Sequence, residues 1–380
     1  MTNTELSPES ILSKLLDTCT RAGATAADAS FGRSDGVSVE VLNGKLEGIE
    51  RSEAQGVSLR CFFGQQQATV SGSDTSEAGL SALAERCVAM AKVVPEDPYC
   101  GLADERDLVR DLPAIDVSGD GEIAADILER EALKAEAAAL SVDGVKQISG
   151  CGNGWSTSER WVAATNGFTA HRQSGSPGLG LAAIAEKDGA MERDYESRSV
   201  RRVEDRTSAE EIGLIAGERA ARRLGAKKVK TQPGAVIYDR RVAGSLIGAF
   251  LSAISGPSVA RGISFLKDQL GESVFAEGVN LIDDPFRVRG MGRRAHDGEG
   301  RAVAETELIE NGVLPRWLLN GASAKQLGLQ PNGYATGGFG SSPGVGVSNA
   351  YLSAGTKSPA ELMKEVERGL LVTDMFGPSI

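Results

Sequence analysis

The spacing of apolar residues predicts short helices and strands in mixed order along the chain. Apolar residues recur with helical period over 11–16, after the capping residue Ser7 and before Gly23, which predicts an N-terminal helix. Between 38 and 74, three segments alternate apolar and polar residues, as the strands of an antiparallel meander do. We therefore expect the first part of the chain to pack a helix against a sheet of short strands.

The middle of the chain repeats this combination of helices and strands. Helical patterns cover 75–94 and 121–140, and the stretch 95–120 between them, rich in Pro, Asp and Gly, predicts a linker. Three strand-like runs follow, and the Asn-Gly pair at 166–167 predicts a tight hairpin. A further helix then ends at Gly225, a residue suited to a helix C-terminus.

The pattern changes near residue 228, where we place a boundary between two domains, 1–228 and 229–380. In the second domain, a helical segment at 239–256 is followed by strands and turns. Glu-Asn-Gly at 310–312 predicts a hairpin, and a capping box predicts an amphipathic helix over 358–374. Because strands and helices do not strictly alternate, the sequence predicts an α+β fold with antiparallel sheets and packed helices. We expect the second domain to be mostly β around a central glycine-rich helix.

The central helix of the second domain has one face that carries almost no side chains. Gly244, Gly248 and Ser252 recur every four residues, although each interior Gly costs a helix about 1 kcal/mol relative to Ala. A face of this kind lets another backbone approach closely. That backbone belongs to a strand of the same domain, a partner subunit or a threaded peptide, and close packing inside the domain explains the pattern equally well.

Composition and charge narrow the class of function. The chain carries 41% hydrophobic and 24% charged residues, as ordinary globular proteins do, and a net charge of −11, which disfavours binding to nucleic acid or to an anionic membrane. The five cysteines show no C-x-x-C pair, and the N-terminus lacks the pattern of a signal peptide. We therefore expect free thiols and a cytoplasmic location. The longest apolar run, 245–254, is about half the length of a membrane span.

Residue types that carry catalysis are sparse in this chain. Only two histidines occur, His171 and His296, without the spacing of zinc ligands, so we expect no metal site. The first is predicted to lie in a strand and the second in a turn. No G-x-S-x-G or Walker motif occurs. The glycine-rich segment 337–347 has backbone amides that suit an anion, yet we interpret it as a flexible surface loop.

Two further groups of residues have structural interpretations. The basic residues between Arg219 and Lys230 follow the end of a predicted helix, where they complement its dipole. They lack the interleaved aromatic residues that nucleic-acid-binding patches use. Cys61 and Cys151 lie in apolar or glycine-rich strands without a neighbouring histidine, so we interpret both as inert core thiols.

Four stretches of the chain resemble one family, in the same order and over nearly the whole length. They are GVSLRCFFGQQQATVSGSD from Gly56, AGSLIGAFLSAISGPSVARGISFLKDQLG from Ala243, DGEGRAVAETELIENGVLPRWLLNGASAKQLGL from Asp297 and LMKEVERGLLVTDMFG from Leu362. The chain resembles the paired bacterial proteins TldD and TldE, the latter also named PmbA or modulator of DNA gyrase. The resemblance implies a metallopeptidase system made of two homologous subunits.

In this family, TldD-like subunits carry an H-E-x-x-x-H motif on the helix that corresponds to 239–256. Laying that motif on this chain places Ile247 and Gly248 at the His-Glu positions and Ser252 at the second His. None of these residues is a suitable zinc ligand. The chain therefore resembles the TldE/PmbA type, with no catalytic residues and no cofactor of its own, and zinc is expected on a TldD-like partner.

The resemblance also bears on the end of the chain. Family members run on through a glycine-rich stretch and several more strands, whereas this sequence stops at Ile380. The resemblance therefore implies an apparently truncated C-terminus and an incomplete sheet in the second domain.

The function implied by the resemblance is that of a non-catalytic subunit of a heteromeric zinc metalloprotease. This chain and a TldD-like subunit would enclose an unfolded peptide that is cleaved. A homodimer is expected when the chain is alone, and neither a membrane nor nucleic acid is expected as a partner. The candidate residues for contact with a partner or a peptide are Gly244, Gly248, Ser252, Arg261, Ser264, Gly337, Gly338 and Gly340.

Two alternatives remain open at this point. One is a protein-binding modulator that acts on DNA gyrase directly, without a proteolytic role. The other is a homodimeric metallopeptidase whose unrecognised site uses His171, His296 and a carboxylate.

Overall fold

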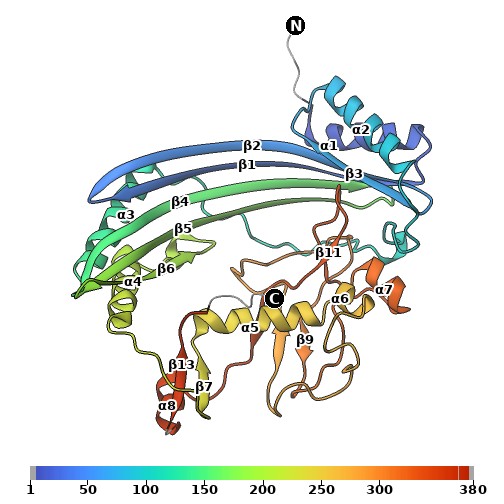
Figure 1. Ribbon diagram of the computed structural model, residues 1–380. Coiled ribbons are helices and arrows are strands. Elements are labelled where there is room, and N and C mark those ends of the chain that lie inside the picture. The colour runs from blue at the N-terminus through green and yellow to red at the C-terminus, as the bar shows by residue number, and fades with distance from the viewer. Residues whose placement is uncertain (1–5, 367, 376–380) are drawn as a thin grey trace.

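The computed structural model describes residues 6–366 and 368–375. Its largest element is an arched six-stranded sheet of strand order β3-β2-β1-β4-β5-β6, in which all neighbours are antiparallel (Figure 1). The strands are β1 (Ala26–Leu42), β2 (Lys45–Phe63), β3 (Gln66–Gly72), β4 (Val145–Ala164), β5 (Thr169–Lys187) and β6 (Ala190–Ser199).

The sheet and its helices consist of two units with the same order of elements, helix, three strands and helix. The first unit runs from α1 (Pro8–Arg21) through β1, β2 and β3 to α2 (Glu77–Ala91). The second runs from α3 (Ala125–Leu140) through β4, β5 and β6 to α4 (Ala209–Arg223). The units meet where β1 pairs with β4, so the strand order reads the same outward from the centre.

Each unit builds its own hydrophobic core between its helices and the sheet. Along β1, Phe31 belongs to the core under α1 and α2, and Val39 belongs to the core under α3 and α4. Because side chains alternate along a strand, these odd-numbered residues share one face. The helices therefore cover one face of the sheet, and the even-numbered residues of β1 lie on the other, concave face.

The C-terminal region lies under the concave face (Figure 1). Its short strands form a sheet of order β12-β8-β9, a pair β10-β11 and a parallel pair β13-β7. Its elements are β7 (Ala235–Tyr238), α5 (Arg240–Ala253), α6 (Gly256–Ala260), β8 (Leu281–Asp283), β9 (Thr306–Ile309), α7 (Gly321–Leu327), β10 (Ala335–Thr336), β11 (Gly344–Val345), β12 (Ala350–Leu352), α8 (Pro359–Glu365) and β13 (Gly369–Val372). Two single turns of 3-10 helix, Glu105–Asp107 and Val203–Asp205, lie in the connections outside this region.

The α+β class and the antiparallel sheet with packed helices, predicted from the sequence, are confirmed. Ser7 caps α1, and Gly225 follows α4 with a positive φ of 73°. The predicted hairpin at 166–167 joins β4 to β5. The strands of the sheet are much longer than predicted. Glycines that suggest strand ends in the sequence lie inside these strands, at points where the backbones of neighbouring strands approach closely. A Cβ on Gly36 of β1 would lie 2.8 Å from the Trp155 carbonyl oxygen of β4.

The predicted helix over 358–374 is wrong beyond its first turns. The capping box of Ser358 and Glu361 is present, but α8 ends at Glu365. The segment 369–372 is instead strand β13, paired in parallel with β7. A Cβ on Gly369 would lie 3.0 Å from the Ala235 carbonyl oxygen, so the absence of a side chain permits this pairing. The truncated C-terminus expected at Ile380 lies outside the described residues.

Strands of the C-terminal region are only two to four residues long, and irregular loops connect them. The predicted turn at 310–312 is present, with positive φ at Asn311 and Gly312. Only its first arm, β9, is a strand, because Val313 forms single bridges with Glu310 and with Ser273 rather than a continuous ladder. No helix within the described residues is both long and apolar enough to cross a membrane.

Candidate functional site

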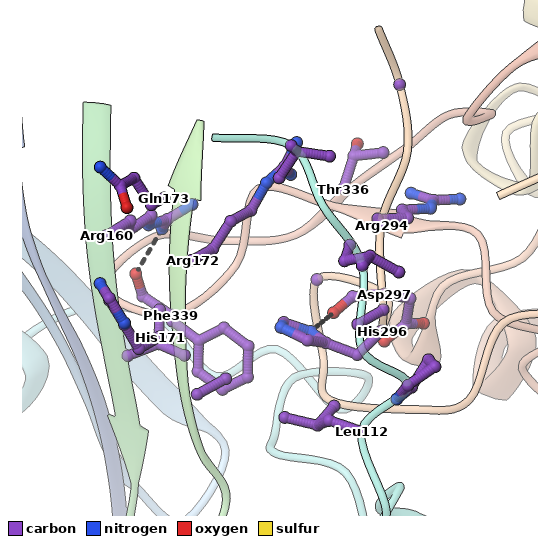
Figure 2. A pocket seen from close by; sticks show the side chains of 18 of the residues that line it. Leu112, Arg160, His171, Arg172, Gln173, Arg294, His296, Asp297, Thr336 and Phe339 are labelled. Atoms are coloured by element: carbon purple, nitrogen blue, oxygen red, sulfur yellow. Dashed lines mark hydrogen bonds between the residues drawn. The ribbon is translucent and has the colours of Figure 1, made fainter. Parts of the chain in front are cut away.

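A cavity of about 680 Å³ lies where the concave face of the sheet, the linker and the C-terminal region meet. Its walls come from β4 and β5 on one side and from 112–118, 291–298 and 335–339 on the others (Figure 2). Three arginines, Arg160, Arg172 and Arg294, line it, and we call it the arginine cavity.

Arg160 and Arg172 lie directly opposite each other on β4 and β5. Arg160 donates hydrogen bonds to the carbonyl oxygens of Gly338 (2.8 Å) and Phe339 (3.1 Å). Arg172 makes no side-chain hydrogen bond or ion pair within the described part of the chain. Burial in the cleft, and then the charges of Arg201, Arg294 and Arg160, lower the pKa of Arg172, although its side chain remains accessible to solvent.

The other nearby arginines, Arg201 and Arg294, form no ion pair within the described residues, although the charges of Asp283 and Asp297 act on Arg294. Arg201 donates to the carbonyl oxygens of Gly175 (3.0 Å) and Met291 (2.6 Å). Arg294 donates to three carbonyl oxygens, at 3.3 to 3.4 Å. In both side chains the Nε atom is buried without a hydrogen-bond partner in the described structure. Carbonyl oxygens satisfy guanidinium donors but leave their positive charge uncompensated.

The carboxylates near the cavity balance only part of its positive charge. Asp28 forms a buried ion pair with Arg60, and Asp116 on the linker pairs with Arg202. Asp297 accepts two backbone N–H bonds at 2.8 and 2.9 Å through Oδ1. Burial raises the pKa of Asp297 to about 6, so at pH 7 this carboxyl is still mostly ionised and offsets one of the three arginine charges, and its Oδ2 is buried without a hydrogen-bond partner in the described structure. The arginine cavity is therefore electropositive in a chain whose net charge is −11.

The two histidines, His171 and His296, both line the arginine cavity, together with Asp297 (Figure 2). His171 lies in β5, as predicted, and its ring stacks on Trp161 with centroids 4.4 Å apart. His296 lies in a loop, packs edge-on against Phe168, and has its pKa lowered chiefly by burial. Among the described residues there is no group of three or more His, Cys, Asp and Glu side chains that could hold a metal ion.

The predicted glycine-rich loop is packed onto the sheet rather than free at the surface. The Gly340 N–H donates to Asp28 at 2.6 Å, and a Cβ on Gly340 would lie 2.5 Å from the Ser58 carbonyl oxygen. A Cβ on Gly338 would meet the Gly298 carbonyl oxygen at 1.8 Å. Gly338 and Gly340 are thus buried in contacts within the chain, whereas Gly337 is exposed.

Helix α5 presents the bare face that the sequence predicted. Gly244, Gly248 and Ser252 are exposed, and a Cβ on either glycine would meet nothing within 4 Å. The Ser252 hydroxyl donates to the Gly248 carbonyl oxygen at 2.9 Å, so it is used within the helix. Ile247 is half-buried and packs against the C-terminal core. These residues do not fit a zinc ion, because no ligand set is present at the motif positions.

The remaining two candidates lie in the turn after α6. Arg261 is exposed, and the Ser264 hydroxyl is buried and accepts the Leu266 N–H bond at 3.0 Å. Between and beside them, Ile263 and Phe265 are 68% and 80% exposed, which is unusual for large apolar side chains. The sequence indicated the segment 258–266 as a candidate contact surface, but its pattern did not show that these two side chains are exposed.

Other groups have the structural roles expected of them. In the basic cluster, Arg219 pairs with Glu196 and Arg223 with Asp194. Arg241 also binds Asp194, which ties α5 to the edge strand β6. All five cysteines are free thiols. A hydrogen bond with Cys19, and then burial, raise the pKa of the Cys61 thiol to about 12, and burial raises that of Cys151 to about 12.

Sequence reasoning did not identify the arginines of the cavity as a group. Arg160 and Arg172 lie at equal distances on either side of Asn166, and the strands pair symmetrically about that residue. The predicted two-residue turn at 166–167 would instead have placed Arg160 opposite Gln173, so the pair of like charges did not follow from it. Arg201 and Arg294 are placed by tertiary structure, for which no local pattern exists.

Known protein families match this chain in three consecutive segments. The matches are PmbA/TldA metallopeptidase domain 1 over residues 27–91, the central domain over 120–224 and the C-terminal domain over 231–380. The metalloprotease PmbA of Escherichia coli O157:H7 is 28% identical over 361 residues, which cover 93% of this chain and 77% of that protein.

Solved structures share the fold over nearly the whole chain. A proposed modulator of DNA gyrase from Bacteroides thetaiotaomicron superposes with a TM-score of 0.89 at 22% identity, covering 97% of this chain and 82% of that one. TldE from Thermococcus kodakarensis gives a TM-score of 0.82 at 20% identity, covering 95% and 81%. With the three matched segments, these similarities establish that the chain belongs to the PmbA/TldD family.

Proposed function

We propose that this protein is a non-catalytic, TldE/PmbA-type subunit of a zinc metalloprotease that cleaves unfolded peptides together with a TldD-like subunit. The observation that carries the proposal is the exposed face of α5. The helix that holds the zinc motif in TldD-like chains here offers Ile247, Gly248 and Ser252, which cannot bind the metal. The zinc and the chemistry it supplies belong to the partner.

The same helix supports a role in association. Gly244 and Gly248 leave open space beside α5, so another backbone can approach the helix axis closely. Ile263 and Phe265, in the turn after α6, are a second exposed apolar feature of the C-terminal region. Large exposed apolar residues of this kind are typical of protein interfaces. We assign this surface to the TldD-like subunit.

A cleavage assay tests the proposal. Unfolded casein is incubated with this chain alone, with a TldD-like subunit from the same genome alone, and with both, each with and without a zinc chelator. We expect chelator-sensitive cleavage in the mixture only. Cleavage by this chain alone would show that it has its own catalytic site, and an inactive mixture at full zinc loading would remove the proteolytic role.

The substitution Gly248→Leu tests the surface itself. Because a Cβ at Gly248 meets nothing within 4 Å, and Leu favours a helix by nearly 1 kcal/mol over Gly, the isolated chain is expected to remain folded and slightly more stable. Binding to the TldD-like subunit, followed by analytical ultracentrifugation, is expected to weaken at least tenfold. Gly48→Leu on β2, where the site is equally open, is the matched control.

If Gly248→Leu unfolds the chain, this face of α5 packs against other parts of the same chain. If the variant binds the partner as the control does, this face is not the interface.

The alternatives have less support in the structure. A homodimeric metallopeptidase would need His171 and His296 in one ligand set, yet no group of three or more potential metal ligands occurs among the described residues, although both histidines line the arginine cavity. Zinc analysis of the purified chain tests this, and stoichiometric zinc would revive it. Direct action on gyrase rests on a name shared with relatives, and a pull-down with purified gyrase in low salt tests it.

A further inference from the structure

We propose that the arginine cavity binds a carboxylate group of a peptide, either a C-terminal carboxylate or an acidic side chain, through Arg172 with the charges of Arg160 and Arg294 behind it. The choice of a peptide as the source of the carboxylate rests on the proposed function. The preference for an anion rests on the cavity alone.

The first argument is the repulsion built into the sheet. Arg160 and Arg172 are directly opposite each other in the register of β4 and β5, where like charges destabilise a strand pair. Arg201 and Arg294 add two further positive charges to the environment of Arg172. A cluster of this kind is unfavourable in the empty cavity, and a bound anion relieves it.

The second argument is the unused donors. Arg172 reaches into the cavity from β5 (Figure 2), and none of its five N–H groups has a partner within the described structure. Arg160 and Arg294 already hold their guanidinium groups in place through carbonyl oxygens. The guanidinium group of Arg172 can donate two parallel hydrogen bonds to one carboxylate, and the fixed guanidinium groups of Arg160 and Arg294 add positive charge nearby.

The third argument separates a peptide from a small inorganic anion. The cavity is also lined by Leu112, Ile115, Val162 and Phe339, and its volume of about 680 Å³ exceeds the space that one anion occupies. Apolar walls around a few charged groups are the usual composition of sites for organic ligands. A carboxylate that carries an apolar chain uses both parts of the wall, whereas phosphate uses only the arginines.

Isothermal titration calorimetry on the isolated chain at low ionic strength tests the proposal. The probes are three acetylated pentapeptides of alternating Ala and Leu. One has a free C-terminal carboxylate, one a C-terminal amide, and one an amide with Glu at the centre. Inorganic phosphate is the fourth probe. We expect at least one carboxylate peptide to bind about tenfold or more tightly than the neutral amide, since hydrogen bonds to charged groups are the strong ones.

Substitutions then locate the binding. Arg172→Gln is expected to remove the preference for a carboxylate, and Arg172→Lys to restore part of it, because it keeps the charge and loses the fork. Arg130→Gln on α3 removes the same charge from an exposed i,i+4 pair and is expected to change nothing. Circular dichroism checks that each variant is folded. The comparison of free acid with amide needs only the wild-type chain.

Several outcomes would overturn the proposal. They are equal affinity for the three peptides, equal loss in Arg172→Gln and Arg130→Gln, and binding of phosphate without either carboxylate peptide. Its failure is distinct from failure of the proposed function. Carboxylate binding without cleavage in the mixture leaves the site intact and removes the protease role, and cleavage without a carboxylate preference does the reverse.

Discussion

At Gly340 the backbone of the C-terminal region contacts the sheet. The substitution Gly340→Ala tests that contact. Gly340 has a φ of +83°, and its N–H donates a hydrogen bond to the buried Asp28 at 2.6 Å. A Cβ atom added at this residue would lie 2.5 Å from the Ser58 carbonyl oxygen. Alanine therefore introduces both a strained backbone angle and a collision with another backbone.

The magnitude follows from these two effects. A left-handed conformation costs a non-glycine residue about 1–2 kcal/mol, partly offset by about 0.4–1 kcal/mol because Ala restricts the unfolded chain. A collision that forces backbone to shift adds about 1–3 kcal/mol. We expect Gly340→Ala to lower the free energy of unfolding by about 2–4 kcal/mol.

Two control variants separate the effects. At Gly167 φ is +88° and a Cβ would meet nothing within 4 Å, so Gly167→Ala carries only the strain, about 1 kcal/mol. At Gly48 there is neither strain nor contact, so Gly48→Ala is expected to stay within about 0.5 kcal/mol of wild type. Urea unfolding followed by the fluorescence of the three tryptophans measures all three variants.

The order of the three variants decides the question. If Gly340→Ala is no more destabilising than Gly167→Ala, the loop does not contact the sheet at Ser58, and the closed arrangement described around the arginine cavity is incorrect.

Three further predictions concern stability and reactivity. Arg172→Gln is expected to raise the free energy of unfolding by about 0.2–1 kcal/mol, because it removes a like charge opposite Arg160, and a loss of stability in urea would contradict this. Burial raises the pKa of Asp297 to about 6, so the folded state retains a proton that the unfolded carboxyl releases near pH 4. The contribution of Asp297 to the free energy of unfolding therefore falls as the pH rises from about 4 to 6, by up to about 3 kcal/mol, and Asp297→Asn is expected to remove this fall from the measured pH profile of unfolding. Cys100 is the one partly exposed cysteine of the five, so iodoacetamide is expected to label it alone in the native protein, as peptide mass analysis would show.

The elements that the sequence predicted well are those with local chemistry. Ser7 before α1 and the Asn-Gly pair at 166–167 act through neighbouring residues, and both are found as predicted. Strand length was underestimated, because Gly36 looks like a break in sequence yet serves a close contact between strands. The segment 369–372 was predicted as helix because its pairing with β7 involves residues more than a hundred positions away.

In the candidate site too, features set by neighbouring residues were predictable and features set by distant contacts were not. The bare face of α5 follows from residue spacing alone, whereas spacing could not show whether that face is packed or open, and the structure leaves Gly244 and Gly248 open. The sequence could not show that Gly340 is buried, because this depends on Ser58 in the other half of the molecule. Nor could it bring Arg294 near Arg172, since the two reach the cavity from different regions of the fold.

The junction of the two three-stranded units has a consequence for folding. Each unit winds through local hairpins, but the junction joins Asp28 to Ala164 and Val41 to Cys151, with more than 100 residues between partners. Pairing over such separations is slow. During synthesis β1, with its buried Phe31 and Val39, therefore waits as an open edge until β4 has left the ribosome. That interval is when the nascent chain is most exposed to aggregation and most in need of a chaperone.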